Sequence, residues 1–566
     1  MISSAASCRF LLLTTALCLL GMGAWTVAQS ANAPQAGNPP NGYRIAGTVV
    51  SKTDGHPLAR ARITISDAKD AQKSQSLVTA EDGKFEFNGL PAGKYSLHGA
   101  KRGFIPSAYD QHEQFWTAIV TGAGLETEAL LLRLAPAGVI SGKILDESGE
   151  PVRRASVTLY YNDHSSGVDQ IHQARGAHTD DQGAYEIVSL SPGTYFLAVS
   201  AKPWYAVHPR SEPSRSMGQR QSEVAENFDR SLDVAYPLTY YPDVTDADSA
   251  TAIPIRGGEH VQVDIHLNPV PSLHLLFRVP NNGNNGFAVP QLEQPTFDGS
   301  TFLQVDGAHI VSPGLVEITG VPAGRYNVHL HGQGAAVQMS GVDLVKDGEE
   351  IDTSSGEALS SVKVSAQALG ETSLPERLSV GLRFAHRNLS SAKAFDAKGE
   401  AELPQIPAGQ YEVLLWGAAK PYSIAHMSAK GATVSGRTLT VPSGSSTSVS
   451  LTIVAGSSNI EGTAKRAGKP FAGAMVVLVP KNPEMNRDLF RRDQSDLDGT
   501  FSFRDVVPGS YTALAIENGW DLDWSQPTVI AAYLNRGQKI EVGNQVGRTT
   551  KLAEAVEVQS KDIQSK

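Results

Sequence analysis

Hydrophobic and polar residues alternate along the chain in short runs. One run places Tyr326, Val328 and Leu330 at every second position, and another does the same with Tyr511 and Ala513. A period of two is typical of β-strands that bury one face and expose the other. The pattern therefore predicts a protein built from many short strands.

A turn recurs five times, each time just before one of these alternating runs. It contains proline and glycine, and a tyrosine follows the glycine by two positions. The copies contain Gly93 and Tyr95, Gly193 and Tyr195, Gly324 and Tyr326, Gly409 and Tyr411, and Gly509 and Tyr511. Successive glycines lie 85 to 131 residues apart, which fits a small β-sandwich and is too long for a helical solenoid repeat or a propeller blade. We interpret these residues as a structural turn in each of five sandwich modules.

Three of the five copies share two further features. Upstream of an aromatic strand they carry an Asp/Gly turn, in which aspartate supplies a local hydrogen bond and glycine a positive φ, so we expect a hairpin there. They also open alike, with a strand, a Gly/Pro turn and a second strand. The Asp/Gly turns contain Asp82 and Gly83, Asp181 and Gly183, and Asp498 and Gly499, and the openings begin at Ile45, Ile140 and Ile460.

Further pairs of alternating runs lie between the turns. They are 117–120 with 128–134, 252–255 with 261–267, and 438–441 with 447–453. Glycine or serine turns join the two members of each pair, so we expect each pair to form a closing hairpin of a sandwich.

The three matched copies resemble the carboxypeptidase regulatory-like domain, a transthyretin-like sandwich of seven strands related to collagen-adhesin B-type repeats. The resemblance covers about half of the mature chain. The third and fourth units keep mainly the turn and the strand after it. In that family the domain is the accessory part of the enzyme, tandem copies are frequent in large secreted proteins of soil bacteria, and related folds are often classed as carbohydrate-binding-like.

The predicted fold class is all-β, with tandem Ig-like or transthyretin-like sandwich modules after a signal peptide. We expect a surface insertion at about 203–233 in the second module, degenerate third and fourth modules, and a C-terminal tail for which a short helix at its start is an alternative. The expected boundaries are 1–30 for the signal peptide, 41–134, 136–268, 270–357, 358–455 and 457–548 for the five modules, and 549–566 for the tail.

The N-terminus carries an export signal. Arg9 precedes an apolar run over 10–27, and small residues follow at 28–31, as in a signal peptide; a retained membrane anchor is the alternative. Both cysteines, Cys8 and Cys18, fall inside this segment, so the mature chain has no thiol for disulfides or catalysis. We expect an exported protein that is periplasmic, cell-surface or secreted, with no transmembrane segment after signal cleavage.

The residues that could carry chemistry point away from catalysis. The formal net charge is -10 and no Lys/Arg-rich run occurs, which argues against nucleic acid as a partner. The motifs of zinc peptidases, serine hydrolases, P-loop enzymes and dinucleotide-binding enzymes are missing, so we predict no enzyme, no catalytic residues and no cofactor. His329 with His331, and the aspartates at 493, 496 and 498, are the candidate metal ligands. An ordinary strand face and a plain turn explain them better, so we predict no metal.

Aromatic residues are the candidate ligand contacts, because their rings stack on sugars or anchor protein interfaces. The predicted binding residues are Trp204, Tyr205, Tyr240 and Tyr241 in the second module, and Tyr236, Trp520, Trp524, Phe115 and Trp116 are further candidates. For each of them, packing of a sandwich is the alternative.

Three functions remain open. The first is an exported, non-catalytic scaffold or adhesion protein of the cell envelope or extracellular space, with its modules strung in series. The second is a carbohydrate-binding protein that uses the aromatics of the second module. The third is an accessory subunit of an exported hydrolase or outer-membrane transporter. Polysaccharides or envelope proteins are the expected partners.

Overall fold

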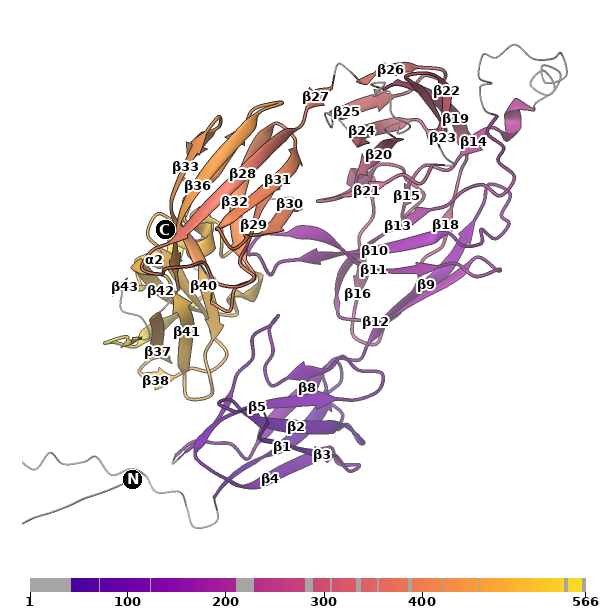
Figure 1. Ribbon diagram of the computed structural model, residues 1–566. Coiled ribbons are helices and arrows are strands. Elements are labelled where there is room, and N and C mark those ends of the chain that lie inside the picture. Colours follow the sequence, from indigo (N-terminus) through magenta and orange to yellow (C-terminus); the bar gives the residue numbers. More distant parts are fainter. Residues whose placement is uncertain are drawn as a thin grey trace, which may run out of the picture.

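The structure is a computed structural model, drawn in Figure 1. It describes residues 42–70, 72–122, 124–209, 229–279, 289–305, 308–331, 337–353, 356–384, 389–420, 422–456, 458–543 and 548–561. The predicted signal peptide lies outside these residues, and so does most of the predicted insertion. No helix within the described ranges is long and apolar enough to cross a membrane.

The strands form five β-sandwiches in succession, which we number as modules 1 to 5 (Figure 1). Module 1 contains β1 (Tyr43–Ser51), β2 (Arg62–Asp67), β3 (Ser74–Val78), β4 (Lys84–Leu90), β5 (Gly93–Ala100), β6 (Ser107–Ala108), β7 (Ile119–Thr121) and β8 (Leu130–Leu134). Module 2 contains β9 (Gly138–Leu145), β10 (Ser156–Asp163), β11 (Gln170–His178), β12 (Ala184–Leu190), β13 (Gly193–Ser200), β15 (Thr239–Tyr240), β16 (Ile253–Ile255), β17 (His260–Gln262), β18 (Ile265–His266) and the 3-10 turns η1 (Arg230–Leu232) and η2 (Ala247–Ser249).

Modules 3 and 4 are built in the same way. Module 3 contains β14 (Val234–Ala235), β19 (Val270–Arg278), β20 (Val289–Pro295), β21 (Ser300–Phe302), β22 (Ala308–Ser312), β23 (Leu315–Pro322), β24 (Gly324–His331), β25 (Val337–Leu344), β26 (Glu350–Asp352) and β27 (Glu357–Ala358). Module 4 contains β28 (Ser360–Ala368), β29 (Ser379–Phe384), β30 (Leu389–Ala394), β31 (Glu400–Ile406), β32 (Gly409–Trp416), β33 (Tyr422–Lys430), β34 (Thr433–Ser435), β35 (Thr438–Val441) and β36 (Ser446–Ala455).

Module 5 differs by carrying an α-helix. It contains β37 (Ser458–Arg466), β38 (Lys469–Pro470), β39 (Met475–Pro480), η4 (Arg487–Leu489), β40 (Arg491–Gln494), β41 (Thr500–Val506), β42 (Gly509–Glu517), η5 (Gly519–Asp521), α2 (Pro527–Leu534), β43 (Gln538–Val542), β44 (Thr549–Lys551) and β45 (Val556–Ser560). The helix covers one side of β39 and β42, where Ile530 and Tyr533 pack with Val477, Leu514 and Trp524.

All five modules share one pattern of strand pairing. In module 1, the first strand β1 lies between β4, which is antiparallel to it, and the last strand β8, which is parallel. The same arrangement recurs around β9, β19, β28 and β37. Modules 3 and 4 therefore have the pairing of the other three, although their sequences keep little of the opening pattern.

The expected closing hairpins are wrong. In module 1 the two runs form β7 and β8, but β7 pairs with β5 in one sheet while β8 pairs with β1 in the other. The corresponding runs of modules 2 and 4 separate in the same way. The glycine and serine turns between the runs thus carry the chain from one sheet to the other.

The expected tail is also wrong over most of its length. Residues 549–551 and 556–560 form β44 and β45, which pair in parallel with β37. Val556 and Val558 are buried in the core of module 5, and the exposed Glu557 lies between them. This segment is the closing parallel strand that every other module also has.

The Asp/Gly turns at Asp82 and Asp498 have the predicted local chemistry, whereas in the second copy Asp180 accepts the hydrogen bonds expected for Asp181. The predicted topology is wrong. The Asp82 carboxylate accepts a hydrogen bond from the amide of Lys84 at 3.2 Å, and Gly83 has φ +66°. However, the turn joins β3 of one sheet to β4 of the other, so it is not a hairpin. A Cβ at Gly83 would lie 2.7 Å from the carbonyl oxygen of Val49, and this close approach requires glycine as much as the positive φ does.

The repeated Pro/Gly turn also crosses between the sheets, and its tyrosine fixes the crossing. Each ring lies in the core, and each hydroxyl donates to the carbonyl oxygen four residues earlier at 2.8 to 3.0 Å. The pairs are Tyr95 with Pro91, Tyr195 with Ser191, Tyr326 with Pro322, Tyr411 with Pro407 and Tyr511 with Val507. The same contact therefore shapes all five modules.

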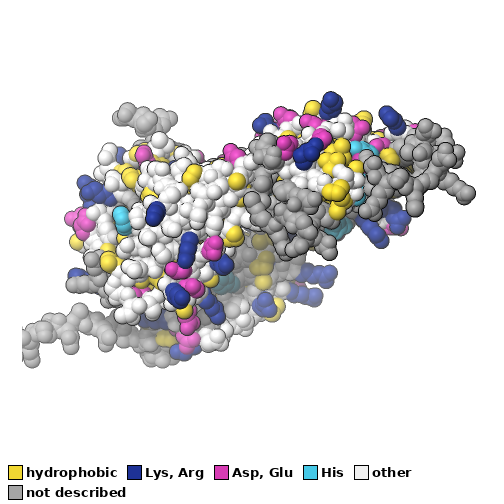
Figure 2. Space-filling model, turned by 45° about the horizontal axis from the view of Figure 1, so that its top comes forward, with side chains coloured by type: hydrophobic (Ala, Val, Ile, Leu, Met, Phe, Trp, Pro, Cys, Tyr) yellow, Lys and Arg dark blue, Asp and Glu magenta, His cyan; other side chains and the backbone are white. Residues whose placement is uncertain are grey.

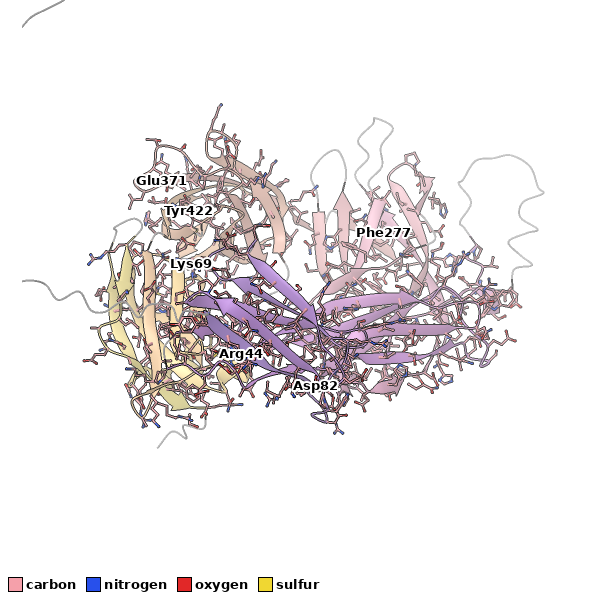
Figure 3. The ribbon with its side chains drawn as sticks, turned by 90° about the horizontal axis from the view of Figure 1, so that it is seen from below. Arg44, Lys69, Asp82, Phe277, Glu371 and Tyr422 are labelled. Atoms are coloured by element: carbon pink, nitrogen blue, oxygen red, sulfur yellow. The ribbon has the colours of Figure 1, made fainter. Side chains whose placement is uncertain are left out.

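The modules follow one another around a closed circuit, with module 1 at the bottom of Figure 1 and module 5 at the left. Module 3 contacts module 2 through Phe297, whose ring lies 5.0 Å from that of Tyr160. Module 4 meets module 5 where Gly436 approaches Met485. Module 5 returns to module 1, and seen from below, the strands of module 1 lie between modules 5 and 2 (Figure 3). Modules predicted to be strung in series therefore close on themselves.

Candidate functional site

Three modules meet at the side chain of Arg492 on β40, which is 3% exposed. Its two terminal nitrogens bind the two carboxylate oxygens of Glu113 in module 1, at 3.0 and 2.5 Å. The Nη2 atom of Arg492 also donates a hydrogen bond to the carbonyl oxygen of Ser165 in module 2 at 2.9 Å. A bidentate guanidinium–carboxylate pair is strong and geometrically specific. Arg492 thus joins modules 1, 2 and 5, and we call this place the junction.

Aromatic rings enclose the guanidinium. The ring centroids of Trp524, Phe115 and Trp520 lie 4.3, 5.1 and 5.9 Å from the Arg492 Cζ. His112 of module 1 stacks on Trp520, with centroids 4.9 Å apart and planes only 4° from parallel. Cation–π attraction grows when the cation is removed from water. These three predicted aromatic candidates therefore pack the junction rather than stand open to a ligand.

A second polar contact joins modules 1 and 5. The Asp496 carboxylate binds the ammonium of Lys94, and it accepts a hydrogen bond from the amide of Ala118 at 3.0 Å. The amide of Leu497 in turn donates to the carbonyl oxygen of Ala118 at 3.1 Å. Burial raises the pKa of Asp496, and the nearby Lys94 opposes this shift. Asp496, one of the candidate metal ligands, thus binds module 1.

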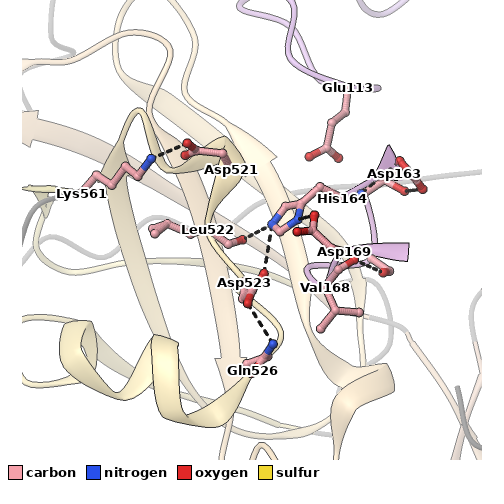
Figure 4. Close-up of polar contacts among 12 residues, drawn as sticks. Glu113, Asp163, His164, Val168, Asp169, Asp521, Leu522, Asp523, Gln526 and Lys561 are labelled. Carbon is pink, nitrogen blue, oxygen red and sulfur yellow. Dashed lines mark hydrogen bonds and ion pairs between the residues drawn. The ribbon is translucent and has the colours of Figure 1, made fainter. Parts of the chain in front are cut away.

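Module 2 reaches module 5 through the loop between β10 and β11 (Figure 4). The two ring nitrogens of His164 lie 2.7 Å from the carbonyl oxygen of Leu522 and 2.8 Å from Asp169. Burial alone would lower the pKa of His164, but these two hydrogen bonds outweigh it and raise the pKa. A Cβ on Gly167 would lie 2.6 Å from the ring of Trp524, so this loop fits closely against module 5.

In module 2, two of the predicted binding residues lie together. Trp204 is 82% exposed, and its ring is perpendicular to that of Tyr205, with centroids 5.8 Å apart. The hydroxyls of Tyr205 and Tyr236 donate to opposite oxygens of Glu147, the second at 3.1 Å. Burial and the bond to Glu147 raise the pKa of Tyr205 to about 12. The exposed indole of Trp204 thus lies beside two tyrosines, Tyr205 and Tyr236, whose hydroxyls are both bound to Glu147. We call these four residues the Trp204 patch.

The other two predicted binding residues do not belong to this patch. Tyr240 is only 1% exposed and packs against Phe297 of module 3, with centroids 5.4 Å apart. Tyr241 is half-buried against the core of module 2. The prediction fails for Tyr240 because module 3 covers β15, and local sequence does not reveal that neighbour.

The candidate metal ligands have other partners. The Nε2 atom of His329 lies 2.7 Å from Glu293, and this hydrogen bond lowers the pKa of Glu293 to about 2. The side chain of His331 lies outside the described residues. Asp493 accepts from the amide of Ser502 at 2.6 Å. Within the described part of the chain, no group of three or more His, Cys, Asp or Glu side chains is arranged to hold a metal ion.

Comparison with known proteins gives a family for the first two modules. The carboxypeptidase regulatory-like domain family matches residues 44–120 and again residues 139–211. Modules 1 and 2 therefore each match the model of this family. Modules 3, 4 and 5 share the strand pairing of modules 1 and 2 but lie outside the matched ranges.

Comparison with solved structures gives matches of low similarity, and no curated protein matches the chain in sequence. One is the TIE protein of Bacillus anthracis, at 9% identity and a TM-score of 0.17, covering 93% of this chain and 76% of the other. Another is the minor pilin of Streptococcus agalactiae, at 15% identity and a TM-score of 0.21, covering 40% of this chain and 97% of the other. A third is the shaft pilin SpaA of Lactobacillus rhamnosus, at 10% identity and a TM-score of 0.18, covering 40% of this chain and 97% of the other.

A buried chain of histidines and carboxylates links module 2 to module 3, and sequence reasoning missed it. Asp233 lies 2.9 Å from the Nδ1 of His208 and 2.7 Å from the Nε2 of His274. Glu317, only 1% exposed, lies 2.6 Å from the Nε2 of His309 and 3.6 Å from the Nδ1 of His274. Two carboxylates thus alternate with three imidazoles.

Two members of this chain, His274 and Asp233, have pKa values that favour the charged form. The nearby carboxylates of Glu317 and Asp233 raise the pKa of His274 to about 9, against the effect of burial. Burial would raise the pKa of Asp233, but hydrogen bonds from His208 and Ser272 lower it overall. The one signal in the sequence was Glu317, an acidic residue inside the otherwise apolar run of β23.

Proposed function

We propose that this chain is an exported, non-catalytic scaffold or adhesion protein whose modules are held together as one platform. The observation that carries the proposal is the junction at Arg492. A buried guanidinium with partners from modules 1 and 2 costs much free energy unless all of those partners stay in place. In a flexible spacer the modules move independently, and a buried contact between them would prevent that motion. In a platform with fixed surfaces the modules keep constant relative positions, which the contact at Arg492 provides.

Two further observations support this proposal. Acidic and basic side chains are interspersed on the face shown in Figure 2. A surface of this kind has no large region of a single charge sign, so it favours binding through local patches over long-range electrostatic attraction. The absence of catalytic motifs from the sequence supports the non-catalytic part. Export rests on the N-terminal segment 1–30, which lies outside the described residues.

The test uses the purified mature chain on a biosensor surface, exposed to sacculi, outer-membrane vesicles and isolated envelope polysaccharide from the producing cells. We expect saturable, reversible retention of at least one component, which Arg492→Ala weakens by opening the junction. The same preparation is assayed with peptide, ester and glycoside substrates. Turnover that survives repeated purification would overturn the non-catalytic part, and lack of retention would overturn the scaffold or adhesion part.

The Trp204 patch favours carbohydrate binding as a second function. An exposed indole beside a fixed tyrosine pair can stack on the apolar face of a sugar ring. On a glycan array, Trp204→Ala should abolish binding that this patch provides, while Trp416→Ala, at a tryptophan of module 4 that is 40% exposed, should not. Equal binding by both variants would exclude the patch.

A further inference from the structure

The outer face of the sheet that holds β2 and β5 carries two hollows, one on each side of Trp116. The first has a volume of about 410 Å³ and is lined by Arg62, His98 and Gln114. The second has about 580 Å³ and extends from β5 to β40 and β41 of module 5. Ligand sites commonly have volumes of this size. We call the two hollows together the module 1 groove.

The side chain of Trp116 lies between the two hollows and lines both of them. It is 41% exposed, and its ring meets that of His98 at 63°, with centroids 5.6 Å apart. The indole is therefore fixed on one side and free on the other. This differs from Trp520 and Trp524, which pack around Arg492.

The floor of the groove is made of small hydroxyl side chains. Thr64 and Ser66 on β2 and Ser96 on β5 line it, and these positions alternate with the core residues Ile63 and Ile65. Small side chains let a flat ring approach the sheet closely, and each hydroxyl can donate one hydrogen bond and accept others. The floor thus suits a ligand that carries many hydroxyl groups.

The end of the groove at module 5 is rich in arginine. Arg504 lines it, together with Arg491, which donates to the carbonyl oxygen of Phe490 at 2.8 Å, and Arg492, which is bound to Glu113. Asp67 and Asp493 line the same hollow, and burial raises the pKa of Asp493 to about 6. Guanidinium groups bind carboxylates with two parallel hydrogen bonds. An anionic group on the ligand is therefore best placed at the exposed Arg504.

We propose that the module 1 groove binds an oligosaccharide that carries carboxylate groups, such as a uronic acid polymer. One sugar ring stacks on Trp116, and a carboxylate lies at Arg504. The second hollow exists only while module 5 lies against module 1, so binding is coupled to the junction. This site is separate from the Trp204 patch and does not depend on the scaffold proposal.

The test is isothermal titration of the full mature chain with hexamers of galacturonate, and with uncharged hexamers of xylose and glucose as controls. We expect the galacturonate hexamer to bind and the uncharged hexamers to bind at least roughly ten-fold more weakly, which corresponds to one ion pair of about 1.4 kcal/mol. Trp116→Ala should abolish binding of all hexamers. Arg504→Gln should remove the preference for galacturonate and leave the weak binding of the uncharged hexamers.

Trp416→Ala is the matched control and should bind as the unchanged chain does. Both Trp116 and Arg504 are exposed, so circular dichroism should show that their variants fold. No binding of the galacturonate hexamer, equal binding of the uncharged hexamers, or full binding by Trp116→Ala would each overturn the proposal. Arg492→Ala should weaken galacturonate binding, and unchanged binding in a chain shown to be open would overturn the coupling to the junction.

Discussion

At the scale of single residues, the tyrosine of the repeated turn makes one hydrogen bond that recurs in every module. Its sequence spacing predicted a turn, but it did not predict that the hydroxyl would reach the carbonyl oxygen four residues back. The turn passes between the sheets, where few backbone groups find partners, so the hydroxyl satisfies an acceptor that the sheets cannot. A similar contact of tyrosine with upstream backbone stabilises immunoglobulin domains.

This bond can be tested at Tyr326, whose ring is 1% exposed and whose hydroxyl donates to Pro322 at 2.9 Å. Tyr326→Phe keeps the ring and removes the hydroxyl, so it should lower the free energy of local opening by about 1 kcal/mol. Hydrogen exchange of peptides from β23 and β24 should then become roughly five-fold faster. Phe302→Leu, at an exposed ring of the same module, should leave these rates unchanged.

His274 should make the stability of module 3 depend on pH. Its pKa is about 9 in the folded protein and about 6.5 in an unfolded chain. The folded state therefore binds the proton more tightly, and the stabilisation is complete below pH 6.5 and is lost as the pH rises through 9. His274→Asn should cost on the order of 3 kcal/mol at pH 6 and much less at pH 10.

Calorimetric unfolding at the two pH values measures this difference. The matched control is His260→Asn at an exposed histidine of module 2, which should change neither transition. A loss of stability in His274→Asn that is the same at pH 6 and pH 10 would show that packing, not the proton, is responsible.

At the scale of elements, the strands were predictable and their partners were not. Alternation in a run such as Tyr326 to Leu330 reports which face is buried, because the side-chain period of a strand is two. It does not report which strand lies alongside. In modules 1, 2, 4 and 5 the last strand pairs in parallel with the strand that opens the module, so the short runs before it looked like hairpins, and β45 looked like a tail.

Substitutions within β45 distinguish a strand from a tail. Val556 is 1% exposed, and its neighbour Glu557 points outward. Val556→Asp should place a carboxylate in the core of module 5 and cost several kcal/mol, whereas Glu557→Gln should cost little. Limited proteolysis of the full chain should cut module 5 only in the first variant. Equal resistance of the two variants would contradict the pairing of β45.

At the scale of the whole molecule, the direct contact of module 5 with module 1, which closes the circuit of modules, could not be predicted from the sequence. Arg492 and Glu113 lie 379 residues apart, and neither stands in a motif. The aromatic residues at 115, 520 and 524 could be recognised as unusual, but packing and binding gave the same local pattern. Of the predicted binding residues, Trp204 and Tyr205 are placed together because they are neighbours in sequence, while the position of Tyr240 depends on module 3.

Arg492→Ala should open the circuit, because it leaves the Glu113 carboxylate, 19% exposed, without its cation at a cost of about 3 kcal/mol. The two cysteines are Cys8 and Cys18, so a chain that begins at residue 31 has none, and spin labels can be placed in it at Lys69→Cys in module 1 and Lys539→Cys in module 5. Pulsed electron resonance should show one narrow distance in the parent and a broad, longer distribution in Arg492→Ala. Arg536→Ala, at an exposed arginine of module 5, should keep the narrow distance, and a narrow distance in Arg492→Ala would contradict the role of the junction.

The junction also determines how the protein responds to a pulling force. Because modules 1 and 5 are bound directly to each other, tension applied between them passes through Arg492, Glu113 and the Lys94 contact, and modules 2, 3 and 4 carry almost none of it. When this contact and the contact of His164 with Leu522 both rupture, modules 2, 3 and 4 come under tension together, and the molecule lengthens without unfolding any sandwich. A few side-chain contacts between modules therefore set the force at which the molecule extends while all of its modules stay folded.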